Sequence, residues 1–187
     1  MSDHREEDAA VASTAPAAVT PELLLAEIDP QSHPGVADRA TAEREVLETQ
    51  QELAELQERL YAESKGSGTR SILLVVQGMD TSGKGGIMRH VVGTIDPQGV
   101  KITGFKAPTD EEKSHDFLWR IRKALPQAGI VGVFDRSHYE DVLIHRVRGF
   151  STPEVIEERY GLIADFEREP TEAGTTVRKV TLHIGED

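Results

Sequence analysis

Residues 71–86 of the chain read Ser-Ile-Leu-Leu-Val-Val-Gln-Gly-Met-Asp-Thr-Ser-Gly-Lys-Gly-Gly. The opening six residues form a largely apolar, partly β-branched run of strand length, which is typical of a buried strand. Gly78, Gly83 and Lys84 then satisfy the spacing Gly-x-x-x-x-Gly-Lys, and residues 87–92 continue as a helical pattern. A strand directly before this spacing and a helix directly after it favour a phosphate-binding loop over a chance match.

The chemistry of this loop follows from its residue types. Glycine tolerates backbone conformations that aim successive amide N–H groups at one anion, and the following helix directs the positive end of its dipole at the same place. We assign phosphate binding to Gly78, Met79, Asp80, Thr81, Ser82, Gly83, Lys84 and Gly85. Gly85 stands where a serine or threonine usually binds magnesium, so Asp80 is the nearest oxygen donor that could replace that hydroxyl.

Charge is spread unevenly along the chain. The 187 residues carry a net charge of −12, from 21 lysines and arginines and 33 aspartates and glutamates. Residues 1–66 contain 5 basic and 15 acidic side chains, whereas residues 67–150 contain 12 basic and 9 acidic ones. The region around the loop is therefore positive and suits an anionic ligand, and we interpret the acidic ends as solvated helical faces.

Composition bounds the class of protein. The length allows one domain with a sizeable core. There is no cysteine, no apolar run of membrane-spanning length and no secretory signal at the start of the sequence. We therefore expect a cytoplasmic protein with no membrane or nucleic-acid partner.

Three regions are expected along the chain. Residues 1–37 read as a largely disordered acidic arm, and residues 38–66 as an amphipathic helix that docks on the core or on a partner subunit. The apolar positions of this helix are Val46, Leu47, Leu53, Leu56 and Leu60. Residues 67–187 read as the core of the protein.

The core pattern alternates strands with helices. Further strands are expected at residues 100–105, 130–135 and 175–184. Between them we expect one helix from Thr109, with Glu112 completing a capping box, to about Pro126, a second over residues 136–148 and a third from Ser151 onward. This alternation predicts an α/β fold with a mainly parallel sheet.

Asp135 is a second candidate site residue, because it ends an apolar strand at the edge where parallel sheets bind ligands. In phosphate-loop enzymes a carboxylate in this position holds magnesium. The alternative is that Asp135 caps the next helix, and one carboxylate could both cap a helix and hold magnesium.

The segment after Asp135 is dense in anion donors. Arg136, Arg146 and Arg148 can each place a planar guanidinium on phosphate oxygens, so residues 136–150 suit a lid over a phosphate chain. A metal site formed by His138, Asp141 and His145 is an alternative that ranks below this one, because the phosphate loop already explains the region.

Several segments together resemble the second family of polyphosphate kinases. They are residues 78–86, 97–100, 105–109, 115–120 and 134–143. The run Ser-His-Tyr-Glu-Asp at residues 137–141 resembles most the class that phosphorylates nucleoside monophosphates as well as diphosphates. The resemblance extends over residues 24–184 and implies a phosphate-loop kinase-like three-layer sandwich.

The resemblance also implies an activity and site residues. Phosphate would move between inorganic polyphosphate and AMP or ADP to form ATP, with Mg²⁺ or alternatively Mn²⁺, guanine nucleotides as further substrates, and a homo-oligomeric enzyme. Asp80, Lys84, Asp135 and Arg136 would be catalytic, with Asp80 and Asp135 binding the metal. Arg136, His138, Tyr139 and Arg146 would contact polyphosphate or form the lid, and Lys106 and Arg120 would lie on the nucleotide side.

Family members continue past the strand that resembles residues 179–184. We therefore expect a C-terminally incomplete core that lacks the last strand and helices, with marginal stability or aggregation. Two alternatives stay open: an ATP-dependent nucleotide kinase, and a nucleotide- or polyphosphate-binding protein without turnover. A GTPase is disfavoured because no Asn-Lys-x-Asp motif occurs.

Overall fold

The computed structural model describes residues 27–32 and 35–185. Most of the arm expected to be disordered, residues 1–37, lies outside this range. The described chain divides into two compact units, residues 49–183 and the other described residues at its two ends. Helix α1 (Arg39–Glu63) begins in the smaller unit and ends in the larger one. At its start, the Asp38 carboxylate accepts a hydrogen bond from the Thr41 N–H at 2.7 Å. The larger unit contains the predicted loop.

The larger unit is built on a four-stranded parallel sheet in the order β2-β3-β1-β4. The strands are β1 (Ser71–Gly78), β2 (Val100–Gly104), β3 (Val131–Asp135) and β4 (Thr175–Leu182). In this register Val76 of β1 lies opposite Asp135 of β3. The prediction of an α/β fold with a parallel sheet is confirmed, and each strand begins within one residue of its expected position.

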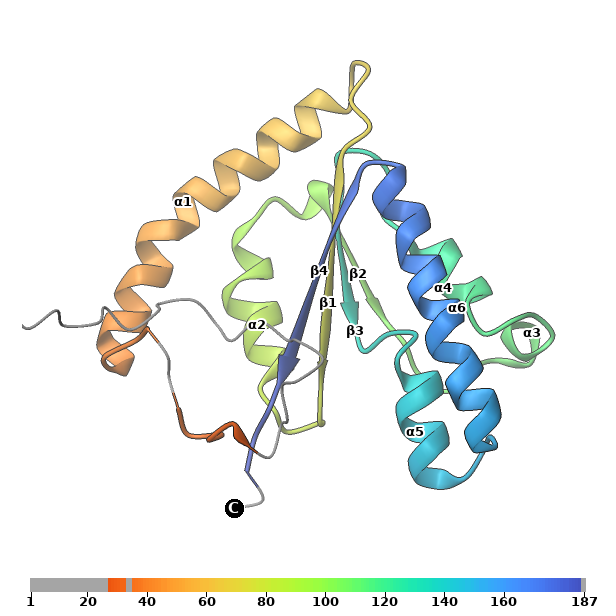
Figure 1. The fold of residues 1–187 in the computed structure, drawn as a ribbon. Helices are drawn as coiled ribbons and strands as arrows, with labels where there is room; N and C mark the ends of the chain where they lie inside the picture. Colours follow the sequence, from red (N-terminus) through yellow and green to blue (C-terminus); the bar gives the residue numbers. More distant parts are fainter. Residues whose placement is uncertain (1–26, 33–34, 186–187) are drawn as a thin grey trace, which may run out of the picture. The chain divides into compact units, whose positions relative to one another are not determined.

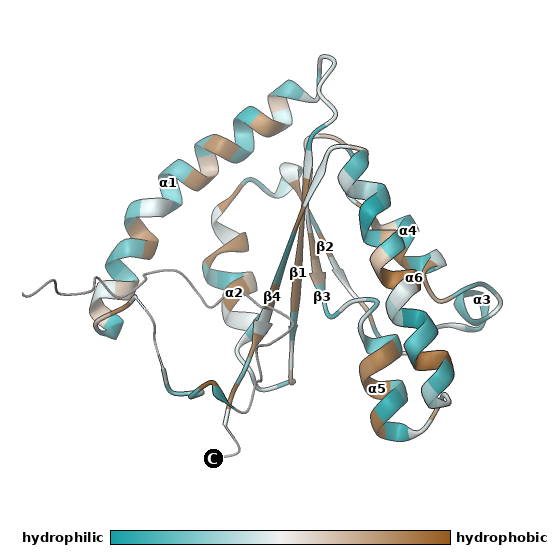
Figure 2. Cartoon of the chain, viewed as in Figure 1, coloured by the Kyte–Doolittle hydropathy of each residue, from teal (hydrophilic) through white to brown (hydrophobic). Residues whose placement is uncertain are grey.

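Both faces of the sheet are covered by helices, which explains why β1 reads as a continuous apolar run. Leu73 and Val75 pack on the side of α4 (Trp119–Ala124), α5 (Glu140–Arg148) and α6 (Pro153–Glu172). Val76 packs on the other side, toward α2 (Lys84–His90). Figure 1 shows these two helical layers with the sheet between them, and Figure 2 shows β1 largely in the hydrophobic colour.

The single helix expected from Thr109 to Pro126 is wrong: two short helices occupy the segment. The predicted capping box is present, and it begins α3 (Asp110–Lys113). The Asp116 carboxylate then accepts a hydrogen bond from the Leu118 N–H at 3.0 Å, and α4 starts only at Trp119. Aspartate offers the backbone a local partner in competition with the helical hydrogen bonds, which accounts for the break.

The helix expected over residues 136–148 begins later than predicted, at Glu140. Arg136 has a left-handed backbone with φ of 63°, which no helix could include. The Ser137 Oγ accepts a hydrogen bond from the Tyr139 N–H at 3.2 Å and closes a short turn. Residues 136–139 therefore form a turn between β3 and α5, which we call the Arg136 turn.

The C-terminal half of α1 contacts the core through a polar side chain. Gln57 is the one buried residue in the helix and packs on the turn η3 (Pro97–Gly99), so close that a Cβ atom on Gly99 would lie 1.5 Å from the Gln57 Nε2. Leu53 and Leu56 of the predicted apolar stripe stay 36% and 51% exposed. No helix of the described residues is long and apolar enough to cross a membrane.

Candidate active site

The loop after β1 is held in shape by two glycines and a lysine. Gly78 and Gly83 have φ values of 155° and 95°, and a Cβ atom at Gly78 would lie 2.5 Å from the Ser82 Oγ. The Lys84 Nζ donates hydrogen bonds to the carbonyl oxygens of Gly78 (2.8 Å) and Met79 (2.7 Å). The ammonium group therefore lies against the loop at the start of α2, where an anion would meet both the lysine and the helix N-terminus.

Arg136 connects the end of β3 to this loop. Its guanidinium donates a hydrogen bond to the Asp80 carboxylate, and the Arg136 N–H donates to the Val76 carbonyl at 3.1 Å. The hydrogen bond with Asp80 raises the pKa of Arg136 above its usual value. The Arg136 side chain is 38% exposed, so it can reach a ligand from this position.

Asp135 fits a metal site better than a helix cap. The helix after it begins five residues later, and the Asp135 Oδ1 is buried without a hydrogen-bond partner. A buried carboxylate oxygen without a partner is costly, and a divalent cation would satisfy it. Asp80 would have to exchange its contact with Arg136 to serve as a second ligand. Among the described residues no three His, Cys, Asp or Glu side chains gather as a metal site, so phosphate oxygens and water would complete the shell.

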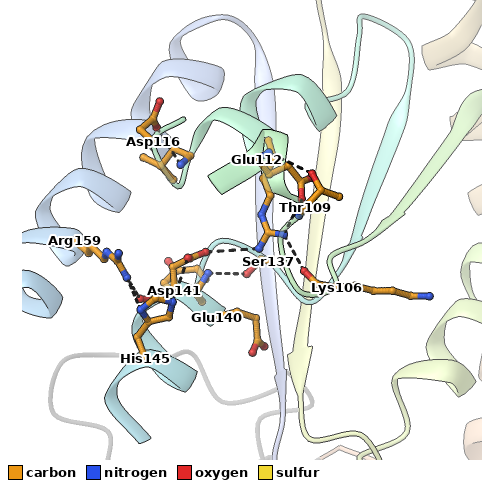
Figure 3. Close-up of polar contacts among 12 residues, drawn as sticks. Lys106, Thr109, Glu112, Asp116, Ser137, Glu140, Asp141, His145 and Arg159 are labelled. Carbon is orange, nitrogen blue, oxygen red and sulfur yellow. Dashed lines mark hydrogen bonds and ion pairs between the residues drawn. The ribbon is translucent and has the colours of Figure 1, made fainter. Parts of the chain in front are cut away.

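Arg120 lies at the centre of a second polar group. Its guanidinium donates to the Lys106 carbonyl at 2.8 Å and lies 3.7 Å from Glu112 and 3.8 Å from Asp141. The guanidinium also lies 5.4 Å from the centre of the Phe105 ring. Figure 3 shows that Lys106 contributes only its backbone here, while its side chain extends away from the group. The Lys106 ammonium is therefore free to meet a ligand.

Asp141, His145 and Arg159 continue this group toward α6 (Figure 3). The Arg159 Nη1 donates to the Asp141 carbonyl at 2.6 Å, and the His145 Nδ1 lies 2.8 Å from the Ser151 Oγ. Burial raises the pKa of Asp141, and burial together with the Arg159 charge lowers the pKa of His145. Both shifts favour neutral side chains in a region already rich in charge.

A pocket of about 390 Å³ lies between the two polar groups. It is lined by Phe105, Lys106, Ala107, Pro108, Arg120, Arg136, Glu140, Asp141, Ile144, His145 and Phe150. One part of this lining is cationic, and another is aromatic and aliphatic. Such a pocket suits a ligand with a phosphate group and a flat, partly apolar body. A larger cavity of about 750 Å³ adjoins it, but neither Arg136 nor the loop lines that cavity.

The structure brings some predicted site residues together and separates others. Asp80, Lys84 and Arg136 meet around the loop. Arg146 lies instead over the Tyr160 ring of α6, 5.8 Å from its centre. The predicted contacts of Arg146 with polyphosphate therefore require it to leave this position, and they stay a prediction.

His138 and Tyr139 point away from the loop, toward α6. His138 is 1% exposed, with its Nε2 atom 3.3 Å from Glu167, and the Tyr139 hydroxyl donates to Glu167 at 2.9 Å. The alternative metal site of His138, Asp141 and His145 does not form, since no such group gathers among the residues the structure covers. Glu167 and Lys179 were not expected at the site: no motif surrounds them, and only the tertiary fold brings α6 and β4 to the Arg136 turn.

Comparison with known proteins gives one family. The family model "Polyphosphate kinase 2 (PPK2)" matches residues 36–187. The AMP/ADP-polyphosphate phosphotransferase of Meiothermus ruber is 43% identical over 135 residues, which are 72% of this chain and 49% of that protein. The ADP-polyphosphate phosphotransferase of Rhodopseudomonas palustris is 39% identical over 160 residues, covering 76% of this chain and 53% of the relative.

Solved structures agree with this result. The crystal structure of polyphosphate kinase 2 from Arthrobacter aurescens TC1 superposes with a TM-score of 0.86 at 56% identity, covering 89% of this chain and 59% of that one. A second structure, described as a putative polyphosphate kinase 2 from Pseudomonas aeruginosa, gives a TM-score of 0.76 at 32% identity. The chain thus spans about half the length of the curated relatives it matches.

Proposed function

The chain belongs to the polyphosphate kinase 2 family, and from that premise we propose that it transfers phosphate between inorganic polyphosphate and a nucleoside mono- or diphosphate. AMP would be converted to ADP and ADP to ATP. One observation carries the proposal: Arg136 both bonds to the phosphate loop and lines the pocket that holds Arg120 and Lys106. A group shared in this way can contact the phosphates of donor and acceptor at once.

The chemistry requires little more than positioning and charge neutralisation. An oxygen of the acceptor phosphate attacks the terminal phosphorus of polyphosphate, the bond from that phosphorus to the bridging oxygen breaks, and the chain leaves one phosphate shorter. Both substrates are polyanions, so Lys84 and Arg136 would offset their repulsion and hold the reacting oxygens in line. Each charge-assisted hydrogen bond to phosphate contributes about 1.5 to 3 kcal/mol.

Asp135, with Asp80, would hold Mg²⁺ or Mn²⁺. The support for this assignment is the buried Asp135 Oδ1, which has no hydrogen-bond partner. The cation would supply further positive charge to the phosphates. In its presence Asp80 would release Arg136 toward the substrate, because the two interactions compete for the same carboxylate.

The nucleotide is proposed to lie in the pocket of about 390 Å³, with its phosphate toward Arg136 and its base toward the apolar wall formed by Ile144 and Phe150. Arg120 is held rigidly by the Lys106 carbonyl and can offer its remaining N–H groups. The names of the relatives from Meiothermus ruber and Rhodopseudomonas palustris support AMP and ADP as acceptors. Guanine nucleotides, a homo-oligomeric state and a cytoplasmic location stay predictions.

The test is to incubate the purified chain with Mg²⁺, long-chain polyphosphate and AMP or ADP, and to measure ATP by luminescence. We expect polyphosphate-dependent ATP, and a loss of at least about a hundredfold in Lys84→Ala, because a preorganised charge contributes this much to transfer. Lys65→Ala is the matched control, since it removes an exposed ammonium next to Tyr61.

The other outcomes separate the alternatives. Near-normal turnover in Lys84→Ala would refute the assigned loop. Formation of ADP from ATP and AMP without polyphosphate would identify an ATP-dependent nucleotide kinase. Binding of polyphosphate or nucleotide by calorimetry, without product in any assay, would identify a binding protein.

A further inference from the structure

Four polar side chains contact one another where the Arg136 turn meets α6 and β4. We call them the Glu167 cluster: His138 and Tyr139 of the turn, Glu167 of α6 and Lys179 of β4. The Glu167 carboxylate accepts hydrogen bonds from the Tyr139 hydroxyl at 2.9 Å and from the Lys179 Nζ at 2.7 Å. The His138 Nε2 lies 3.3 Å from the same carboxylate. Lys179 also donates to the Tyr139 hydroxyl at 3.0 Å. The cluster thereby ties α6 and β4 to the turn that carries Arg136.

The Arg136 turn needs such support. Arg136 is the one non-glycine residue of the described chain with a positive φ, and a strained backbone persists only where its surroundings hold it. On the β1 side, the Ser137 Oγ lies 3.4 Å from the Gln77 Oε1, and the Gln77 Nε2 donates to Glu140 at 2.6 Å. Glu167 of α6 supplies further contacts to the turn, through His138 and Tyr139.

The Glu167 carboxylate stays ionised in this place. Burial alone would raise the pKa of Glu167, but hydrogen bonds from His138, Lys179 and Tyr139 outweigh it and lower the pKa to about 2. The His138 ring is wedged against the Phe166 ring at 5.3 Å and is almost wholly buried. Removing the carboxylate would leave a buried imidazole and a half-buried ammonium without their acceptor.

We propose that Glu167 is a positioning residue: it holds the Arg136 turn from the side of α6, so that the Arg136 guanidinium points at the phosphate loop. The inference rests on the proposed function, because only there does Arg136 act on phosphate. A purely structural Glu167 would change stability without a specific coupling to Arg136.

The first measurement is kcat for polyphosphate-dependent ATP formation. We expect Glu167→Ala to lower kcat by about tenfold to a hundredfold, the loss that a small misplacement of a reacting group produces. Glu167→Gln keeps the shape and one acceptor oxygen, so it should recover part of this loss. The control is Glu169→Ala on the same helix, which removes only the two hydrogen bonds from Arg122, at 3.1 and 3.3 Å, and should leave kcat unchanged.

A double-mutant cycle with Arg136→Ala separates a positioning role from a purely structural one, because it measures whether the effect of Glu167→Ala on kcat depends on Arg136. If Glu167 acts through Arg136, Glu167→Ala should cost less than about threefold once Arg136 is absent, because coupled residues are non-additive. The same full loss in both backgrounds would overturn the proposal. So would a kcat of Glu167→Ala equal to that of the unmodified chain.

Hydrogen exchange tests the positioning without requiring activity. The amides of residues 136–139, including the Arg136 N–H bonded to Val76, should exchange at least about tenfold faster in Glu167→Ala and unchanged in Glu169→Ala. If the unmodified chain transfers no phosphate, the proposed function fails, and this exchange result still decides the role of Glu167. Unchanged protection of the turn would overturn that role.

Discussion

Arg136 has a strained backbone conformation, and its side chain contacts the loop after β1. A positive φ costs a non-glycine residue about 1–3 kcal/mol, whereas Gly83 in the loop adopts one without that penalty. The same conformation keeps Arg136 out of α5 and lets its guanidinium reach Asp80. The sequence identified Arg136 as a candidate site residue but did not predict this conformation, since Gln77 and Glu167, which contact the neighbouring residues of the turn, lie far away along the chain.

Glu167 should make the stability of the protein sensitive to acid. Its folded pKa of about 2 lies below the ordinary value of 4.5, so between these values the folded state binds fewer protons than the unfolded state. The contribution of Glu167 is then complete above about pH 4.5 and is lost as the pH falls toward about 2. Thermal melts should show a difference between the unmodified chain and Glu167→Gln that is constant from about pH 6 to about pH 4.5 and shrinks from there toward about pH 3.

The control for this melt series is Glu169→Gln on the same helix, which removes a surface ion pair with Arg122 of α4. Such pairs contribute about 0–1 kcal/mol, so the melting temperature should change little. A difference between Glu167→Gln and the unmodified chain that stayed constant down to about pH 3 would contradict the low pKa of Glu167.

Elements were predictable where one periodic signal dominates. Apolar runs of strand length located β1 and β3, short stretches with β-branched residues located β2 and β4, and the glycine-rich loop located α2. Prediction failed where a side chain competes with the backbone, as at Asp116, which interrupts the helix expected up to Pro126. The burial of the polar Gln57 was not expected, and because Leu56 stays exposed, docking of the apolar stripe of α1 on a partner subunit stays a prediction.

Two glycine substitutions test these elements, because we expect one to raise and the other to lower the free energy of unfolding. Gly161 lies within α6 with open space around it, so Gly161→Ala should stabilise the protein by about 0.5–1 kcal/mol through helix propensity. Gly99→Ala should destabilise it by about 1 kcal/mol, because the new methyl group displaces buried Gln57. Urea denaturation measures both changes. The Gly99→Ala effect should disappear in a Gln57→Ala background, and persistence there would show that the contact with α1 is not its cause.

At the scale of the whole molecule, the charge pattern and the fold both indicate a candidate anion site at the C-terminal ends of the parallel strands. The parallel strands bring the C-terminal residues of β1, β2 and β3 together, and Lys84 and Arg136 from the net positive region 67–150 lie at the loop that follows β1. Sequence could place the phosphate loop and Asp135 at this edge, because each follows its own strand directly. It could not place Glu167 or the Arg120 contacts, because these depend on how α4, α5 and α6 pack against one another.

This arrangement predicts a measurable dependence on salt. Polyphosphate is a linear polyanion, so its binding releases counterions in proportion to the number of cations that contact it. With Lys84, Arg136 and Arg146 as three such contacts at about 0.7 each, log KM for polyphosphate should rise with log salt with a slope of about 2. The slope for AMP should be smaller, because AMP carries far fewer charges. Steady-state kinetics in NaCl at fixed Mg²⁺ would measure both slopes.

The variant Arg146→Ala makes this test specific to the lid, because Arg146 lies over Tyr160 in the present structure. If Arg146 leaves that ring to contact polyphosphate, Arg146→Ala should lower the slope by about 0.7. Lys65 lies over the Tyr61 ring and precedes the start of β1, whereas the loop follows the end of that strand, so Lys65→Ala should keep the full slope. An unchanged slope in Arg146→Ala would mean that this arginine serves packing on α6 and not the lid, and that Lys84 and Arg136 carry the electrostatic attraction.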